Sequence, residues 1–152
     1  MRLVAVHNTD LDDWIAARHY LHSTPAGAVL RLEILDDNDN RIGGMLWGRP
    51  TSRHIDQRRI LQLTRMYLVD DTEPYAESKA LSKARQYIRR HYPQINGLIT
   101  YASTGEGHEG TIYQADGWMM LGHTRQQRRG WSNRPGRIDR DLTPKVRYVR
   151  TP

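Results

Sequence analysis

RILQLTRMYLV at residues 59–69 precedes DDTEP at 70–74, a helical stretch at 76–91 and the apolar run INGLITYA at 95–102. The first segment alternates, which predicts a strand with two distinct faces. One face holds Ile60, Gln62, Thr64, Met66 and Leu68, and the other holds Leu61, Leu63, Arg65, Tyr67 and Val69. Apolar residues at helical spacing predict a helix that ends before Pro93. A strand, a helix and a second, buried strand predict an α/β domain.

The flanking sequence extends this pattern in both directions. Before it we expect a strand at 2–7, a helix from an N-capping Asp10 to about Leu21, and a hairpin of strands 28–35 and 41–48. After it we expect a helix at 107–115, a break at Gly117, and strands at 118–124 and 145–149. The 152 residues fit one domain over residues 1–152.

Composition excludes several classes of protein. The chain has no cysteine, which excludes disulfides, thiolate metal sites and a cysteine nucleophile. Mean hydropathy is -0.77, and no run approaches the roughly 20 apolar residues of a spanning helix. The N-terminal residues show no basic region followed by an apolar run. We therefore expect a protein of the cytoplasm that has no membrane partner.

Positive charge is concentrated at the C-terminal end. The net charge is +6, and residues 77–152 hold 14 basic and 6 acidic side chains, mostly arginine on the basic side. Arginine binds phosphate through a two-pronged fork, so a nucleic-acid partner is favoured over a merely solvated tail. The expected phosphate contacts lie in a segment at about 123–140 and are Arg125, Arg128, Arg129, Arg134 and Arg137. Asp139 and Asp141 are expected to pair with arginines there.

Two sets of motifs resemble known families. GTIYQADGW at 110–118 resembles the late helix of the GNAT acyltransferase superfamily, where a tyrosine lies four residues before a glycine–aromatic pair. A wider set resembles the Mom DNA-modification family of bacteriophage Mu and prophages over about residues 59–150. The segments are LTRMYL at 63–68, ESKAL at 77–81, YPQINGLITYAS at 92–103, GHEGTIYQADGW at 107–118 and GWSNRPGR at 130–137, with RHYLH at 18–22 also similar.

The resemblance implies a GNAT-like domain, a mixed central sheet flanked by helices. It implies conversion of adenine in double-stranded DNA to a carbamoylmethyl adenine, which protects phage DNA from restriction in the bacterial host cell. By the same resemblance, Tyr113 protonates the leaving group. Relatives often carry Asp at the strand end where this chain has Ser103 or Thr104, so a base there is not transferable.

The donor is open. Acetyl-CoA users of the superfamily carry a glycine-rich loop between the fourth strand and its helix, and its backbone amides bind the pyrophosphate. This chain has DDTEPYAESKA at 70–80, with four acidic residues and no glycine, which disfavours acetyl-CoA. Glycyl-tRNA is the alternative, because a glycyl group on the adenine amine is an isomer of carbamoylmethyl adenine and can rearrange to it.

Further candidate residues follow from position. Ser78 begins the central helix and could bind a donor carbonyl or cap the helix; His108 precedes the late helix as a base or a cap. Arg65 and Tyr67 share a strand face, and Tyr101 and Ser103 end the buried strand. The aromatic candidates for stacking on a flipped base are Trp47, Tyr67, Tyr101 and Trp131.

Other interpretations stay open. His19 and His22, three residues apart on the expected first helix, could bind a metal, but two ligands alone are a weak pattern. The alternatives to DNA modification are an acetyl-CoA-dependent N-acetyltransferase of a small amine or protein, and a nucleic-acid-binding module without catalysis. The sequence leaves open a homodimer, a metal requirement and the DNA context.

Overall fold

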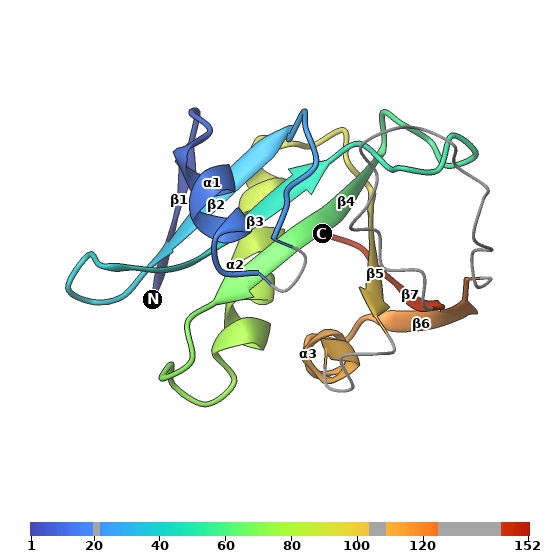
Figure 1. Cartoon of the computed structure of the whole chain (residues 1–152). Helices are drawn as coiled ribbons and strands as arrows, with labels where there is room; N and C mark the ends of the chain where they lie inside the picture. Colours follow the sequence, from blue (N-terminus) through green and yellow to red (C-terminus); the bar gives the residue numbers. More distant parts are fainter. Residues whose placement is uncertain (20–21, 104–108, 125–143) are drawn as a thin grey trace.

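The computed structural model describes residues 1–19, 22–103, 109–124 and 144–152 (Figure 1). The elements are β1 (Arg2–Val6), α1 (Asp10–Ala16), β2 (Leu30–Leu35), β3 (Arg41–Gly48), β4 (Ile60–Leu68), α2 (Ala76–His91), β5 (Gly97–Ser103), α3 (Glu109–Ala115), β6 (Met119–His123) and β7 (Lys145–Arg150). Every element expected from the sequence is present, and all but the first helix agree with the expected bounds to within a few residues.

One seven-stranded sheet, in the order β1-β2-β3-β4-β5-β7-β6, runs through the molecule. The first four strands are joined antiparallel, and β4 and β5 are parallel because α2 carries the chain back between them. β7 lies between β5 and β6 and is antiparallel to both. The sheet is therefore mixed, as the family resemblance implied.

Helices cover both faces of this sheet, with α1 on one side and α2 on the other (Figure 1). The larger core joins α2 and α3 to the sheet and includes Trp47, Leu63, Ala84 and Tyr148. A second cluster packs α1 on β3 and β4 through Leu11, Ile15 and Leu46. We call these two sides of the sheet the α2 face and the α1 face.

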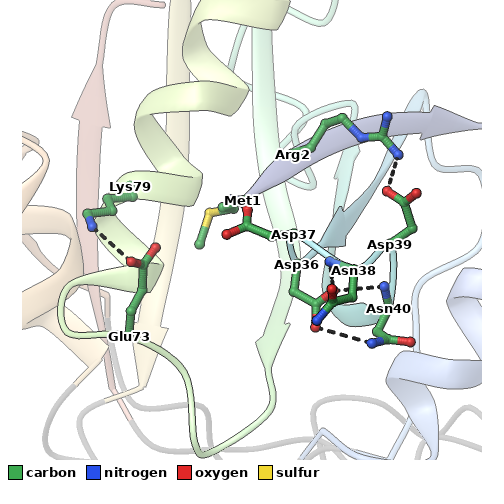
Figure 2. Close-up of polar contacts among 9 residues, drawn as sticks. All are labelled: Met1, Arg2, Asp36, Asp37, Asn38, Asp39, Asn40, Glu73 and Lys79. Carbon is green, nitrogen blue, oxygen red and sulfur yellow. Dashed lines mark hydrogen bonds and ion pairs between the residues drawn. The ribbon is translucent and has the colours of Figure 1, made fainter.

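The β2–β3 turn is built by one side chain. Oδ1 of Asp36 accepts hydrogen bonds from the backbone N–H groups of Asn38 and Asn40, both at 2.9 Å (Figure 2). These bonds favour the carboxylate and lower the pKa of Asp36 below its usual value. Asp39 takes a left-handed conformation with φ 62°, which asparagine and aspartate tolerate in turns. The turn residues thus close the predicted hairpin.

Helix α1 is shorter than predicted. It ends at Ala16 rather than near Leu21, and its N-cap is Thr9 rather than Asp10. Oδ1 of Asn8 accepts from the N–H of Asp10 at 3.2 Å, which begins the helix one residue early. After Ala17 the chain turns, because the N–H of Arg18 and that of His19 both bond to the carbonyl of Ile15. His19 is buried on this turn.

Candidate functional site

β4 and β5 separate partway along their length. They pair over only four registers, from Ile60 with Gly97 to Leu63 with Thr100. Beyond that point β4 continues alongside β3, and β5 continues alongside β7. The facing edges of Thr64–Leu68 and Tyr101–Ser103 therefore diverge, and no sheet pairing joins them. An extended ligand can bind to such strand edges, so we call this region the β4–β5 fork.

A β-bulge in β4 lies at the start of the fork. Trp47 pairs with Leu63 but Leu46 pairs with Arg65, so Thr64 is an extra residue, and its hydroxyl donates to the Leu46 carbonyl at 3.0 Å. A bulge turns the following side chains to the other side of the sheet. Leu61 and Leu63 pack in the α2-face core, whereas Tyr67 packs with the α1 cluster.

The alternation predicted for this strand was therefore wrong in one respect. Leu61 and Leu63 do not share a face with Arg65 and Tyr67, because Thr64 interrupts the two-residue period. The prediction that Arg65 and Tyr67 share a face is confirmed by the unbroken register from Arg65 to Tyr67. The bulge thereby directs an arginine and a tyrosine away from the main core, onto the α1 face beside the fork.

Backbone carbonyls hold the Arg65 guanidinium. Its Nε donates to the carbonyl of Ser23 at 3.0 Å, and its Nη1 donates to the carbonyl of Thr64 at 2.7 Å. Ser23 follows the turn after α1, so this contact ties that turn to β4. The neighbouring Tyr67 ring meets Trp14 of α1 edge to face, with ring centroids 5.7 Å apart. Helix α1 therefore covers the β4 side of the fork.

His19 lies close to this arginine. Burial, and then the positive charges of Arg65 and His22, lower the pKa of His19 from 6.5 to about 4. At pH 7 the His19 side chain is therefore neutral. The prediction that His19 and His22 lie on one helix was wrong, because both follow the end of α1. Among the described residues no group of three or more metal-ligating side chains exists.

Tyr113 is held by aromatic contacts on the α2 face. It is 6% exposed, stacks on Tyr148 of β7 at 5.4 Å and meets Trp118 edge to face at 5.5 Å. Gly110 makes room for this packing, because a Cβ there would lie 2.5 Å from the Tyr148 hydroxyl. The structure thus places Tyr113 across the sheet from Arg65 and Tyr67, and it divides the predicted catalytic residues between two faces.

The end of β5 forms the other edge of the fork. Tyr101 is the first residue beyond the paired segment, and strand alternation turns it and Ser103 away from Ala102, which packs in the α2-face core. Burial raises the pKa of Tyr101 above its usual value, and the positive charge of Arg147 opposes that shift. Tyr101 and Ser103 therefore lie on the α1 face, as do Arg65 and Tyr67.

Trp47, predicted to stack on a base, does not reach the surface. Its side chain is fully buried in the α2-face core. The strand position was correct, but the bulge and the packing of α2 enclose the ring, so this prediction was wrong. His108, Trp131 and the five arginines Arg125, Arg128, Arg129, Arg134 and Arg137 lie outside the described residues.

The β4–α2 loop has its own internal contacts. The N–H of Thr72 donates to the carbonyl of Asp70, and the N–H of Ala76 donates to that of Glu73 at 3.2 Å. Pro74 has no N–H. Glu73 also forms an ion pair with Lys79 at 3.3 Å across the first turn of α2 (Figure 2). Two backbone N–H groups of this loop, those of Thr72 and Ala76, are thus engaged within it, and Pro74 contributes none.

Ser78 and Tyr75 complete the start of α2. The Ser78 hydroxyl donates to the carbonyl of Tyr75 at 3.0 Å, which is a local contact within the first turn. Tyr75 precedes the helix in a left-handed conformation, with φ 62°. It is 75% exposed, so packing does not hold it there. The prediction that Ser78 caps the helix was wrong, because Tyr75 is the N-cap residue and no side-chain cap hydrogen bond is made there. A role of Ser78 toward a donor carbonyl stays a prediction.

Sequence reasoning missed two groups near these residues. Arg85 and Asp116 form a buried ion pair between α2 and the end of α3. Arg147 of β7 lies beside Tyr101 in the register. The sequence contained a sign that Arg85 is buried, because it falls at helical spacing among the apolar residues Leu81, Ala84 and Ile88. Nothing in the sequence pairs Arg147 with Tyr101.

Comparison with solved structures identifies the fold. An aminoglycoside acetyltransferase in complex with coenzyme A and kanamycin aligns over 98% of this chain and 93% of its own, with a TM-score of 0.69 and 13% identity. A spermidine N-acetyltransferase from Vibrio cholerae with coenzyme A and spermine aligns over 99% and 94%, with a TM-score of 0.67 and 12% identity. A GNAT-superfamily phosphinothricin acetyltransferase from Sinorhizobium meliloti also aligns, at a TM-score of 0.59. The fold is that of the GNAT acetyltransferases.

Sequence comparison gives a narrower relation. The methylcarbamoylase Mom of Escherichia phage Mu is 29% identical over 116 residues, which is 71% of this chain and 48% of that protein. This chain thus spans about half the length of that relative. No helix among the described residues has the length and apolar character needed to cross a membrane. The model of the Mom protein family matches residues 1–140, and the chain belongs to that family.

Proposed function

We propose that this chain modifies adenine in double-stranded DNA through acyl-transfer-like chemistry at the β4–β5 fork. The fork is the observation that carries the proposal. It opens after Leu63 and Thr100, and Arg65, Tyr67 and Tyr101 lie along its edges on one face of the sheet. Membership of the Mom family and the phage relative's name, methylcarbamoylase, support transfer of a group containing carbon and nitrogen. Such a substrate would be met in the cytoplasm of a bacterial host cell.

The donor in this proposal does not use a pyrophosphate site. Coenzyme A complexes exist for proteins of this fold. In this chain, however, the β4–α2 loop contains Asp70, Asp71 and Glu73 and no glycine, and the N–H groups of Thr72 and Ala76 are bonded within the loop. Carboxylates repel a pyrophosphate, and bonded N–H groups cannot cradle it. The residues present do not fit coenzyme A bound in this way.

An aminoacyl ester of tRNA is the donor class that we favour. The adenine amine attacks the carbonyl carbon of a glycyl ester, a C–N bond forms, and the ester C–O bond breaks. The amine proton goes to a base, and the tRNA oxygen receives a proton. The glycyl amine then adds to C6 of the purine through a five-membered ring, and cleavage of the original C6–N bond leaves the carbamoylmethyl amine. This sequence needs no oxidant or reductant.

The chain's own side chains have distinct roles in this scheme. Neutral His19, buried beside Arg65, is our candidate to accept the amine proton. The Arg65 guanidinium is our candidate to polarise the donor carbonyl. Tyr113 approaches from the opposite face and is our candidate to protonate the leaving oxygen. These roles require a substrate that lies between the separated strands, because Arg65 and Tyr113 are on opposite faces of the sheet.

Nucleoside mass spectrometry tests the function. DNA from cells that express this chain should contain an adenosine species of carbamoylmethyl mass. Tyr113→Phe should remove it, and Tyr87→Phe, a tyrosine of α2 outside the site, should not. Unmodified DNA from cells that contain folded protein and charged glycyl-tRNA would contradict the proposal.

A second candidate has support from the fold. An acetyl-CoA-dependent N-acetyltransferase matches the activity named for the structural neighbours. Coenzyme A should then raise the melting temperature of the purified chain by several degrees at saturating concentration. We expect no shift, because of the acidic β4–α2 loop. A shift that survives in high salt would favour the acetyltransferase.

A further inference from the structure

Arg147 lies on β7, the strand between β5 and the edge strand β6. It pairs with Tyr101 of β5 on one side and with Gly122 of β6 on the other. The adjacent Tyr148 packs on Tyr113 in the α2-face core. Side chains alternate along a strand, so Arg147 points to the opposite, α1 face. It shares that face with Tyr101.

One donor of the Arg147 guanidinium has no partner in the described part of the protein. Its Nε is buried and has no hydrogen-bond partner there. By contrast, Arg85 and Arg31 are each held by a carboxylate. The Nε of Arg150 is also buried without a described partner, but its Nη1 donates to the carbonyl of Gly117 at 3.0 Å. A buried donor without a partner is costly, and a bound ligand is one common reason for it.

The residues around Arg147 favour a negatively charged ligand. Neither β5 nor β7 contains an aspartate or glutamate. Lys145, which pairs with Ser103, adds a second cation on the same face. On the other side of Arg147, a Cβ on Gly122 would meet no atom of the described residues within 4 Å. An anion can approach this face without meeting a carboxylate from either strand.

The aromatic ring of Tyr101 favours a nucleotide over a free inorganic anion. Paired residues on neighbouring strands bring their side chains together on one face, so an aromatic ring lies next to the guanidinium. An arginine fork beside an aromatic ring fits a nucleotide, whose phosphate and base or sugar need these two partners. A free inorganic anion would make no use of the ring.

We propose that Arg147 and Tyr101 form a nucleic-acid contact in which Arg147 binds a backbone phosphate and Tyr101 stacks on the adjoining base or sugar. Because Tyr101 is the first residue beyond the paired part of β5, this contact lies at the start of the fork. It therefore rests on the proposed function, and it assigns duplex DNA, the acceptor, to this surface. Transfer RNA carries the same phosphodiester chemistry, so the experiment must separate the two.

Fluorescence anisotropy on the full chain with a labelled DNA duplex tests the contact. Arg147→Met should weaken binding about tenfold at low salt and lower the slope of log affinity against log salt by about one. The matched control is Arg90→Met, which removes the same charge from an exposed site on α2. That control should leave the salt slope unchanged. If the two variants weaken binding equally, Arg147 contributes only through the net charge of the protein, and the proposal is overturned.

Two further variants protect the test against misfolding. Arg147→Lys keeps the charge without the fork and should recover only part of the affinity. Tyr101→Leu should weaken binding without changing the salt slope, because stacking releases no counterion. Circular dichroism and thermal unfolding check that each variant is folded. Wild-type affinity in Arg147→Met and Tyr101→Leu would overturn the proposal.

Parallel titrations with duplex DNA and with uncharged tRNA identify the ligand of Arg147. Together with the adenosine measurement, they distinguish failure of this contact from failure of the proposed function. If Arg147→Met weakens binding of uncharged tRNA but not of duplex DNA, the assignment to the acceptor is overturned. If Arg147 governs DNA affinity in a chain that makes no modified adenosine, the contact stands and the proposed function fails. If adenosine is modified but Arg147→Met binds DNA like the wild type, the function stands and the contact fails.

Discussion

Arg85 of α2 forms a bidentate ion pair with Asp116, in which its Nε donates to Oδ2 at 2.8 Å and its Nη2 donates to Oδ1 at 2.7 Å. The Trp118 indole N–H also donates to Oδ2, at 2.9 Å. Both charged side chains are almost completely buried. Since Trp118 also packs edge to face on Tyr113, this network connects α2 with the segment that holds the candidate proton donor.

Removing one partner of this pair should be strongly destabilising. Asp116→Ala leaves a buried guanidinium unpaired, and we expect a loss of about 3–5 kcal/mol in the free energy of unfolding. The double variant Arg85→Met, Asp116→Leu buries no charge and should lose less than that. Urea unfolding of the three proteins measures the difference. A double variant as unstable as the single one would show that packing, rather than the unpaired charge, sets the cost.

His19 should make stability depend on pH. Its pKa is about 4 in the folded chain and 6.5 when exposed, so the unfolded chain binds more protons between these values. Its contribution is complete above pH 6.5 and is lost as the pH falls towards 4, by about 3 kcal/mol in total. Urea unfolding at pH 7.5 and 4.5 should show a smaller loss in His19→Gln than in the wild type. Equal losses would argue against a buried neutral histidine.

Substitution by alanine should affect stability differently at two glycines of β3, Gly43 and Gly48. A Cβ on Gly43 would collide with the backbone carbonyl of Tyr67 and with the Leu68 side chain. The carbonyl is part of the β3–β4 pairing and cannot move without disturbing the sheet. Gly43→Ala should cost about 1–3 kcal/mol. Gly48 serves as the control, because its Cβ would lie 3.8 Å from Thr64, an ordinary contact. Thermal unfolding of the two variants compares them, and similar melting temperatures would contradict the register of β3 and β4.

Tyrosine titration can test the pair Tyr101 and Arg147. Burial raises the pKa of Tyr101, and the Arg147 cation lowers it. Arg147→Met should therefore raise the pKa of Tyr101 further, because the phenolate loses its neighbouring positive charge. Ultraviolet absorbance between pH 9 and 12 follows the titration, with Tyr101→Phe to assign the signal. An unchanged Tyr101 titration in Arg147→Met would place the two groups too far apart to interact.

Local sequence was sufficient for the elements themselves. The alternation in 59–69, the helical spacing in 76–91 and the turn residues at 36–40 act over a few neighbours, and each produced the element expected. The parallel placement of β4 and β5 around α2 fits the α/β prediction from the same stretch. The family resemblance, carried by motifs rather than by periodicity, is confirmed by the match to the Mom family.

Tertiary structure alone decided which side chains meet. One extra residue, Thr64, moves Arg65 and Tyr67 off the face of Leu63, and a two-residue pattern cannot reveal that. Helix α1 ends early, and His19 is buried near Arg65, a residue distant in sequence. β7 is the last strand in the chain, yet it lies between β5 and β6, and this puts Arg147 beside Tyr101. Sequence periodicity reports each residue's own strand or helix, whereas register, burial and charge contact depend on partners brought together only by folding.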